Sequence, residues 1–214
     1  MVKHIKQMDV WEGNFGKNYT KRNLSSLKEM NAEYIKNFGI SRSNINKRFL
    51  DGLDRSIRIL EVGTNVGNKL VCLQQMGFTN LYGIELQQDA VEKAKTRTRH
   101  INIIQGSSFD IPFKDGFFDL VFTSGLLIHI PPNDLKDVFS EMVRVSRKYI
   151  WGMECFAPQY TAVQYHGKVN LFWKTDFVRI FLSDFKIFKC VKEEKFIYKN
   201  DGNVDMMYLL KRKH

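Results

Sequence analysis

The stretch Ile57-Arg-Ile-Leu-Glu-Val-Gly-Thr-Asn-Val-Gly67 predicts a buried strand that runs through a glycine turn into a helix. Residues 57–62 are mostly apolar and β-branched, as in a short buried strand. The turn lies between Gly63 and Gly67, and Leu70 continues the apolar pattern on the helix. Glycine lets a ligand approach the backbone, and a helix N-terminus presents free N–H groups. We therefore expect a nucleotide-sized binding site at this turn.

The turn reads Glu61-x-Gly63-x-Asn65-x-Gly67, which differs from the dinucleotide pattern G-x-G-x-x-G. A carboxylate before the first glycine disfavours a pyrophosphate and suits a ligand with a cationic or hydroxyl-rich part. The pattern resembles motif I of class I S-adenosylmethionine (SAM)-dependent methyltransferases, E/D-x-G-x-G-x-G. Asn65 replaces the middle glycine, and asparagine tolerates a positive φ better than most residues. The resemblance implies that these four residues bind SAM, and an unrelated strand–helix turn is the alternative.

The composition fits a folded protein of a reducing compartment. The 214 residues predict one domain, with or without a cap, and a hydrophobic content of 43% supports a sizeable core. Cys72, Cys155 and Cys190 have no metal-ligand spacing, so we expect no metal site. Residues 1–10 lack a signal-peptide pattern, and no apolar run is long enough to cross a bilayer. We expect a cytoplasmic protein without membrane contact.

The formal net charge of +10 fits either nucleic acid or a small anionic substrate. The lysines are scattered along the chain, and the interleaved basic and aromatic residues typical of RNA binding are missing from the sequence. The charge therefore favours a small anionic acceptor, and nucleic acid is not the expected partner. The sequence leaves the oligomeric state open.

Three more strands follow in alternation with helices. They are expected at Leu81–Glu85, Ile101–Gln105 and Phe117–Thr123. In an open α/β sheet, ligands bind beyond the carboxyl ends of the strands. Glu85 ends the second strand, where an acidic residue holds the ribose hydroxyls of an adenosine ligand, and Leu86 follows it. Ser124 and Gly125 end the fourth strand, so we expect them at the cofactor as well.

The third strand leads into Gly106-Ser-Ser-Phe-Asp-Ile-Pro-Phe113. This stretch resembles G-D-A-x-x-L-P-F of class I methyltransferases, in which the residues after the glycine contact adenine. Ser107 replaces the common aspartate, and its hydroxyl still suits the adenine amino group. The resemblance implies backbone and stacking contacts from Ser108 and Phe109.

Residues 1–56 are predicted to form a helical lid ahead of a SAM-binding domain at 57–214. Aromatic residues and glycines alternate between Trp11 and Tyr19, as in a close-packed turn that leads into a helix. Tyr19 and Arg22 lie on one helical face, and Arg22 is suited to a bidentate pair with the SAM carboxylate. The alternatives are a lid held only by its aromatics and a solvated Arg22.

The last third of the chain departs from strict alternation. A fifth strand is expected at Tyr149–Cys155, an insert at 156–174, and a short helix capped by Thr175. Further strands are expected at Phe185–Val191, Lys195–Tyr198 and Val204–Leu210, with a hairpin turn at Asn200-Asp-Gly-Asn203. The predicted fold class is α/β: a Rossmann-like class I methyltransferase fold. It has a seven-stranded, mostly parallel sheet, an antiparallel C-terminal hairpin and a helical N-terminal lid.

Four motifs narrow the resemblance. They are W-x-G-x-F-G-x-x-Y-x-x-R-N at Trp11–Asn23, E-V-G-x-N-x-G at Glu61–Gly67, F-T-S-G-x-L-I-H-I at Phe122–Ile130 and Tyr-x-Gly at Tyr165. Together, from about Trp11 to Leu210, they resemble the methyltransferases associated with pseudaminic acid (nonulosonic sugar) biosynthesis. The resemblance implies methyl transfer from SAM, with S-adenosylhomocysteine (SAH) as product, to a sugar or nucleotide-sugar. An RNA methyltransferase and a SAM-binding protein without turnover are the alternatives.

The insert carries the predicted acceptor contacts Tyr165, His166 and Lys168. The family commonly has Tyr-Arg-Gly-His at this point, so the substitutions here leave the acceptor less firmly implied than the reaction. The insert is equally consistent with a packing clasp that places Phe172 and Trp173 in the core.

An acceptor hydroxyl or amine must lose a proton, and a general base assists this. His129 is the first candidate, because it follows the fourth strand beside the expected methyl group. Glu154 and His166 are the other candidates. The alternative for His129 is a hydrogen-bonded histidine that only shapes its loop.

Overall fold

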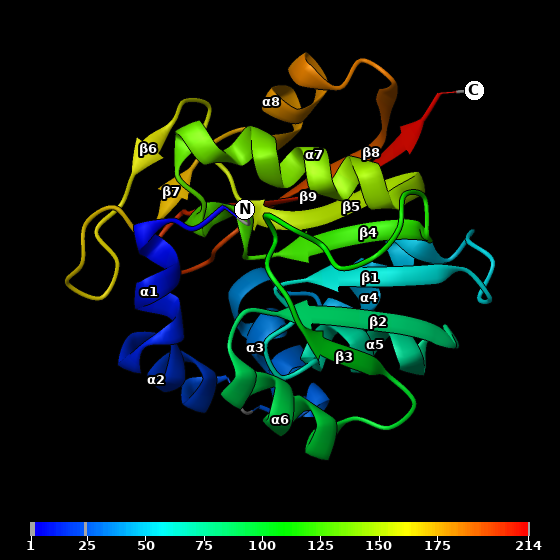
Figure 1. Cartoon of the computed structure of the whole chain (residues 1–214), viewed down its shortest axis with the longest axis horizontal. Helices are drawn as coiled ribbons and strands as arrows, with labels where there is room; N and C mark the ends of the chain where they lie inside the picture. The colour runs from blue at the N-terminus through cyan, green and yellow to red at the C-terminus, as the bar shows by residue number, and fades with distance from the viewer. Residues whose placement is uncertain (1–2, 24, 214) are drawn as a thin grey trace.

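The computed structural model describes residues 3–23 and 25–213, and a seven-stranded sheet forms its centre (Figure 1). The strand order is β3-β2-β1-β4-β5-β9-β8. The strands are β1 (Arg58–Val62), β2 (Asn80–Glu85), β3 (Asn102–Gln105), β4 (Phe118–Ser124), β5 (Ser146–Cys155), β8 (Phe188–Ile197) and β9 (Val204–Arg212). The first five are parallel, whereas β9 pairs antiparallel with both β5 and β8. The predicted fold class is confirmed.

Helices cover both faces of the sheet. They are α1 (Lys6–Glu12), α2 (Asn14–Arg22), α3 (Leu27–Phe38), α4 (Arg42–Leu50), α5 (Asn68–Gln75), α6 (Gln88–Arg97), α7 (Leu135–Val145) and α8 (Phe177–Asp184). Two short 3-10 turns, η1 (Leu127–His129) and η2 (Pro132–Asp134), precede α7. Helices α4, α5 and α6 share one buried apolar cluster with the sheet, and α7 and α8 share the other. Figure 1 shows α7 and α8 together on one side, with α3, α4 and α5 behind the sheet.

The segment 1–56 contributes to two different places. Helices α1 and α2 stand beside the carboxyl ends of β1 and β2, toward which the strand arrows of Figure 1 point. Helix α4 instead packs into the core, where Ile45 and Leu50 are fully buried against the sheet. The lid-like part of this segment is therefore α1 and α2.

Two details of the C-terminal third correct the sequence-based expectations. The strands predicted at Phe185–Val191 and Lys195–Tyr198 are one strand, β8, which carries an irregularity between Cys190 and Lys192. The extra residue shifts the alternation of side chains, which explains why the pattern reads as two strands. Helix α8 is capped by Asp176, whose carboxylate accepts the Arg179 N–H at 2.9 Å, and not by Thr175.

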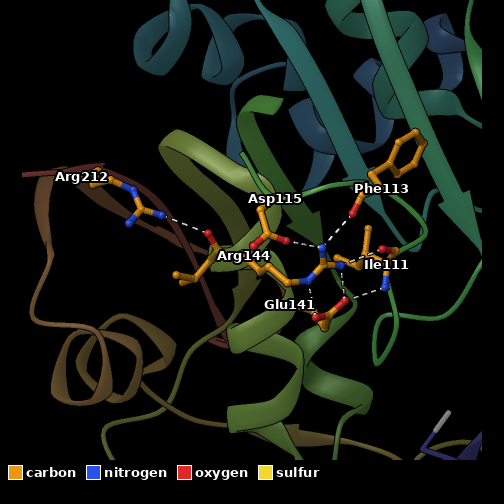
Figure 2. Close-up of polar contacts among 7 residues, drawn as sticks. Ile111, Phe113, Asp115, Glu141, Arg144 and Arg212 are labelled. Carbon is orange, nitrogen blue, oxygen red and sulfur yellow. Dashed lines mark hydrogen bonds and ion pairs between the residues drawn. The ribbon is translucent and has the colours of Figure 1, made fainter. Parts of the chain in front are cut away.

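Arg144 of α7 holds the loop between β3 and β4 (Figure 2). Its guanidinium donates to the carbonyl oxygens of Ile111 and Phe113, at 2.8 Å each, and pairs with Glu141 and Asp115. Glu141 also accepts the Ile111 N–H, at 2.7 Å. The hydrogen bonds from Arg144 lower the pKa of Glu141, which keeps this pair charged. The loop is thereby fixed on the carboxyl side of β3.

Candidate functional site

A pocket opens at the carboxyl ends of β1, β2 and β4, beneath α1 and α2. Most residues predicted to bind the cofactor line it. They are Tyr19, Gly63, Asn65, Glu85, Leu86, Ser107, Ser108, Phe109, Ser124 and Gly125. His129, the first candidate base, lines the same pocket. Residues that lie far apart in the sequence therefore meet at one site.

The glycine turn adopts the backbone that the sequence implied. Gly63, Asn65 and Gly67 all have positive φ, at 75°, 49° and 81°. A Cβ at Gly63 would also lie 2.9 Å from the Leu126 side chain, so glycine is required there for two reasons. Asn65 replaces glycine in the left-handed region without breaking the turn, as expected for asparagine.

Glu61 and Gly67 belong to the motif but do not line the pocket. Gly67 is the N-cap residue of helix α5. Glu61 is fully buried, and one of its carboxylate oxygens accepts the Thr64 hydroxyl at 2.7 Å. Its other oxygen has no hydrogen-bond partner among the described residues. Burial raises the pKa of Glu61 to about 7. Its position indicates a role behind the turn instead of a direct contact with ligand.

Glu85 ties two loops together at the end of β2. It is 7% exposed, and its oxygens accept the N–H groups of Asn65, at 2.8 Å, and Gln87, at 3.0 Å. Burial raises its pKa, although these backbone hydrogen bonds act in the opposite direction. Each carboxylate oxygen can accept more than one hydrogen bond, so Glu85 retains capacity toward the pocket.

His129 faces the pocket from η1 with its tautomer fixed. Its Nδ1 lies 2.6 Å from the Leu171 carbonyl oxygen, and a carbonyl only accepts, so Nδ1 carries the proton. The neutral ring then has a free lone pair at Nε2. The side chain is 7% exposed and lies against Trp11, with ring centroids 4.5 Å apart. Burial lowers the pKa of His129 to about 4, so the ring is neutral near pH 7.

Glu154 and His166, the other candidate bases, do not line the pocket. Glu154 is 2% exposed and lies beneath the loop after β4, where it accepts the N–H groups of Leu126 and Ile128 at 3.3 and 3.4 Å. Burial raises its pKa to about 7. His166 is exposed on the insert. Glu154 thus holds the loop that carries His129, and of the three candidate bases His129 is the one that lines the pocket.

The insert 156–174 contains a tight turn and a buried aromatic anchor. Tyr165 and Lys168 exchange backbone hydrogen bonds of 2.9 and 3.0 Å around His166 and Gly167, whose φ values are 48° and 76°. Two positive φ values define a type I′ turn. His166 and Lys168 are exposed, whereas Tyr165 stacks on Phe172 at a centroid distance of 5.3 Å.

The buried aromatics of this insert support the packing clasp. Phe172 and Trp173 are 8% and 6% exposed, and the short strands β6 (Thr161–Ala162) and β7 (Trp173–Lys174) join the two ends of the insert. None of the three predicted acceptor contacts, Tyr165, His166 and Lys168, lines the pocket.

Helices α1 and α2 are pinned over the pocket. Asn65 donates to the Thr20 hydroxyl at 3.1 Å, and Gln7 donates to the Asn170 carbonyl of the insert at 3.3 Å. Gly16 allows the close approach of the two helices, because a Cβ there would lie 1.7 Å from the Trp11 carbonyl oxygen and 2.9 Å from Gln87. These contacts join α2 to the glycine turn and α1 to the insert.

Arg22 does not line the pocket, although sequence reasoning placed it at the SAM carboxylate; its side chain is exposed on α2. Several lining residues were not predicted from the sequence to bind a ligand: Ile5, Gln7, Met8, Trp11, Lys69 and Gln87. The alternation of aromatics and glycines marked the Trp11 segment as a lid, but nothing in the pattern distinguished Lys69 from other surface lysines.

Three buried polar atoms at the pocket have no partner among the described residues: Trp11 Nε1, Asn65 Oδ1 and Gln87 Oε1. Leaving a buried donor or acceptor unpaired costs free energy. A ligand with its own donors and acceptors would satisfy such atoms, so this pocket fits a polar nucleoside. In the described residues, no group of three His, Cys, Asp or Glu could hold a metal, and no helix is long and apolar enough to span a membrane.

Residues 60–149 match the sequence family described as a methyltransferase domain. This segment, which is less than half of the chain, is therefore similar to methyltransferase domains. The chain is 33% identical over 88 residues to an uncharacterized methyltransferase of Synechocystis sp., and the alignment covers 41% of each chain. The alignments span less than half the length of the curated relatives that the chain matches.

Two solved methyltransferases share the fold of the whole chain. Magnesium protoporphyrin IX methyltransferase of Synechocystis PCC 6803, with bound SAM, has a TM-score of 0.71 and 13% identity, with full coverage of both chains. Geranyl diphosphate C-methyltransferase of Streptomyces coelicolor A3(2), solved with SAH, has a TM-score of 0.71 and 12% identity, with 98% coverage of both. At these identities the likeness shows the fold. Both neighbours were solved with SAM or SAH bound, and the methyltransferase-domain match over residues 60–149 agrees with SAM as the predicted cofactor.

Proposed function

We propose that this protein transfers a methyl group from SAM to a hydroxyl or amine of a small molecule. The observation that carries the proposal is the neutral His129, which has a free lone pair at Nε2 and lines the same pocket as Glu85 and the glycine turn. A SAM site alone needs no such base, whereas methylation of a hydroxyl or amine does.

The adenosine half of SAM fits the β2–β3 side of the pocket. Glu85 would accept hydrogen bonds from the ribose hydroxyls, as acidic residues at the end of a second strand do. Ser108 and Phe109 line the pocket beside it, and Ser107 is held in place by accepting the Phe109 N–H at 3.1 Å. The unpaired Gln87 and Asn65 oxygens are available to donors of the cofactor.

SAM supplies a methyl group that is already activated on a sulfonium, so the protein contributes mainly position and proton removal. His129 Nε2 would accept the proton of the acceptor hydroxyl or amine, while the methyl carbon bonds to the acceptor, its bond to sulfur breaks and SAH leaves. The Leu171 carbonyl keeps Nδ1 protonated, so that Nε2 is the lone-pair atom throughout. Trp11, packed against the ring, would exclude water from this end of the pocket.

A sugar or nucleotide-sugar of nonulosonic (pseudaminic) acid biosynthesis is the acceptor that the sequence motifs suggest. Lys168 and His166 are exposed and would pair with a carboxylate or phosphate of such an acceptor. An RNA methyltransferase and a SAM-binding protein without turnover are the competing functions. Only the net charge of +10 supports the RNA methyltransferase.

The proposal is tested by incubating the protein with isotope-labelled SAM and a panel of sugar nucleotides and nonulosonic acids, with mass spectrometry of the products. A labelled product with equimolar SAH is expected. SAM binding without product from the panel or from tRNA would favour the non-catalytic alternative. Binding of tRNA with a steep salt dependence would favour RNA.

We expect α1 and α2 to act as a lid that is ordered by the cofactor. Gly16→Ala should displace the two helices, because the new Cβ would overlap the Trp11 carbonyl oxygen. The variant should be cleaved faster near Phe15 by a protease and should bind SAM more weakly, while the wild-type protein should become more resistant when SAH is added. Gly52→Ala is the matched control, because a Cβ there meets no atom within 4 Å. Equal cleavage of wild-type protein with and without SAH would contradict a ligand-ordered lid.

We expect Lys168 and Tyr165 of the insert to have different roles, one in acceptor binding and the other in stability. Lys168→Ala should raise the acceptor KM and leave the melting temperature and SAM affinity unchanged, because the side chain is exposed. Tyr165→Ala should lower the melting temperature by removing the stack on Phe172, whereas Tyr165→Phe should keep it. Thermal denaturation, SAM titration and acceptor kinetics on the three variants check this. A loss of stability in Lys168→Ala without a kinetic defect would reject the role in acceptor selection.

A further inference from the structure

One apolar face of helix α1 forms a wall of the pocket. Ile5, the N-cap residue of α1, and then Met8 and Trp11 follow one another at intervals of three residues, which places them on the same side of the helix. All three line the pocket and are only partly buried, and none of the described residues of α1 is buried. Covering apolar surface that faces water is favourable, so this face suits an apolar ligand.

Two contacts place this face opposite the chain that follows β4. At one end of α1, Trp11 packs on His129, with ring centroids 4.5 Å apart. Ahead of the other end, the ammonium group of Lys3 pairs with the Asp134 carboxylate at 2.6 Å. The rest of the apolar face lies between these two contacts on α1, and Ile130 lies between them on the opposite side.

The pocket is therefore apolar on two sides where it meets the candidate base. The apolar residues that line it here come from α1 and from the chain around η1: Ile5, Met8, Trp11, Leu126 and Ile130. Among the described residues that line the pocket, the only charged side chains are Glu85 and Lys69, which belong to β2 and α5. A polyhydroxylated group at this wall would lose hydrogen bonds to water without replacing them, which costs free energy.

Trp11 adds one polar group to the apolar wall. Its indole Nε1 is buried and has no hydrogen-bond partner within the described part of the chain. An indole N–H only donates, whereas the free Nε2 of His129 only accepts. One donor and one acceptor beside each other match a single hydroxyl group, whose oxygen accepts and whose proton is donated.

We propose that the acceptor is an apolar molecule, a phenol or a hydrocarbon alcohol, whose reacting hydroxyl lies beside Trp11 and His129. This inference rests on the proposed function, in which His129 accepts the proton, and it narrows the class of acceptor. A sugar fits this wall only if it is deoxygenated or acylated next to the reacting hydroxyl.

The test compares β-naphthol with glucuronate, a polyhydroxylated sugar acid, on the protein saturated with SAH. In isothermal titration, β-naphthol should bind at least about tenfold more tightly than glucuronate. Met8→Gln should weaken β-naphthol about fourfold, equivalent to one buried CH₂ group, and leave SAH within about twofold. Val10→Gln is the matched control and should change neither ligand, because Val10 is also partly buried on α1 but does not line the pocket.

A second measurement tests the orientation of the hydroxyl. With labelled SAM in place of SAH, mass spectrometry should detect the methyl ether of β-naphthol. In that reaction the naphthol oxygen gains the methyl group, the methyl–sulfur bond breaks to leave SAH, and the naphthol proton passes to His129. Trp11→Phe keeps an aromatic ring against His129 but removes the Nε1 donor, so it should weaken β-naphthol about fivefold.

Four results would overturn the inference. They are glucuronate binding as tightly as β-naphthol, unchanged β-naphthol affinity in Met8→Gln, β-naphthol binding without formation of its methyl ether, and an equal loss in Met8→Gln and Val10→Gln. The last result, with a lower melting temperature, would mean that both changes displace α1. Failure of the wild-type protein to bind SAH would instead refute the proposed function, and it is distinct because SAH is titrated before either acceptor compound is added.

Discussion

Replacing Glu85 with alanine should weaken SAM binding at least about 100-fold, because two hydrogen bonds from the ribose to a carboxylate are lost at about 1.5–3 kcal/mol each. The same change removes the acceptor for the Asn65 and Gln87 N–H groups, so the melting temperature should also fall. Isothermal titration at a temperature well below unfolding separates the two effects.

The matched control for Glu85 is Asp119, another buried carboxylate at the amino end of β4. Asp119 accepts the Arg58 N–H at 3.0 Å and pairs with Arg147 at 2.6 Å, and it does not line the pocket. Asp119→Ala should lower the melting temperature while SAM affinity is unchanged. If a folded Glu85→Ala protein binds SAM as tightly as the wild type, Glu85 does not hold the ribose.

His129→Ala should lower kcat about 100- to 10,000-fold, the range for loss of a general base, with SAM affinity nearly unchanged. The measurement uses labelled SAM and the acceptor that the mass-spectrometric screen identifies. His100→Asn, at an exposed loop position with φ of 59°, is the control and should keep full activity. A His129→Ala enzyme with wild-type kcat would leave the histidine with only a role in shaping the loop.

The pH dependence of His129 follows from its lowered pKa. Since its pKa is about 4 in the folded protein, Nε2 remains unprotonated throughout the neutral range, and any acidic limb of kcat/KM due to His129 should lie near pH 4 instead of 6.5. The unfolded chain binds the proton more readily. The stability tied to this group is therefore complete above about pH 6.5 and falls as the pH drops toward 4. Kinetics and denaturant unfolding across pH 4–8 check both statements.

Much of the site was predictable because it depends on strand ends. The sequence places Glu85, Ser107 and Ser124 at the ends of apolar runs, and parallel strands bring such ends to one edge of the sheet. Asn65 was predictable for the same kind of local reason, since few residues other than glycine accept a positive φ.

The sequence did not predict that Lys69, and not Arg22, lines the pocket. Both are cations near predicted motifs, and which one enters the pocket depends on how α2 and α5 pack, which no local pattern specifies. The two strands predicted in place of β8 failed for a different reason, because an irregularity near Cys190 interrupts the alternation that marks a strand.

The hydrogen bond from His129 to the Leu171 carbonyl has a consequence for how this protein could change its substrate. The acceptor is a main-chain oxygen, which every amino acid supplies, so the chemical competence of the histidine does not depend on which residues the exposed turn of the insert carries. The turn at residues 165–168 can therefore vary in sequence, or be exchanged for a turn of similar span, while the proton acceptor keeps its orientation. Under the proposed function, substrate choice and proton transfer would therefore be separately adjustable, although one segment of chain would serve both.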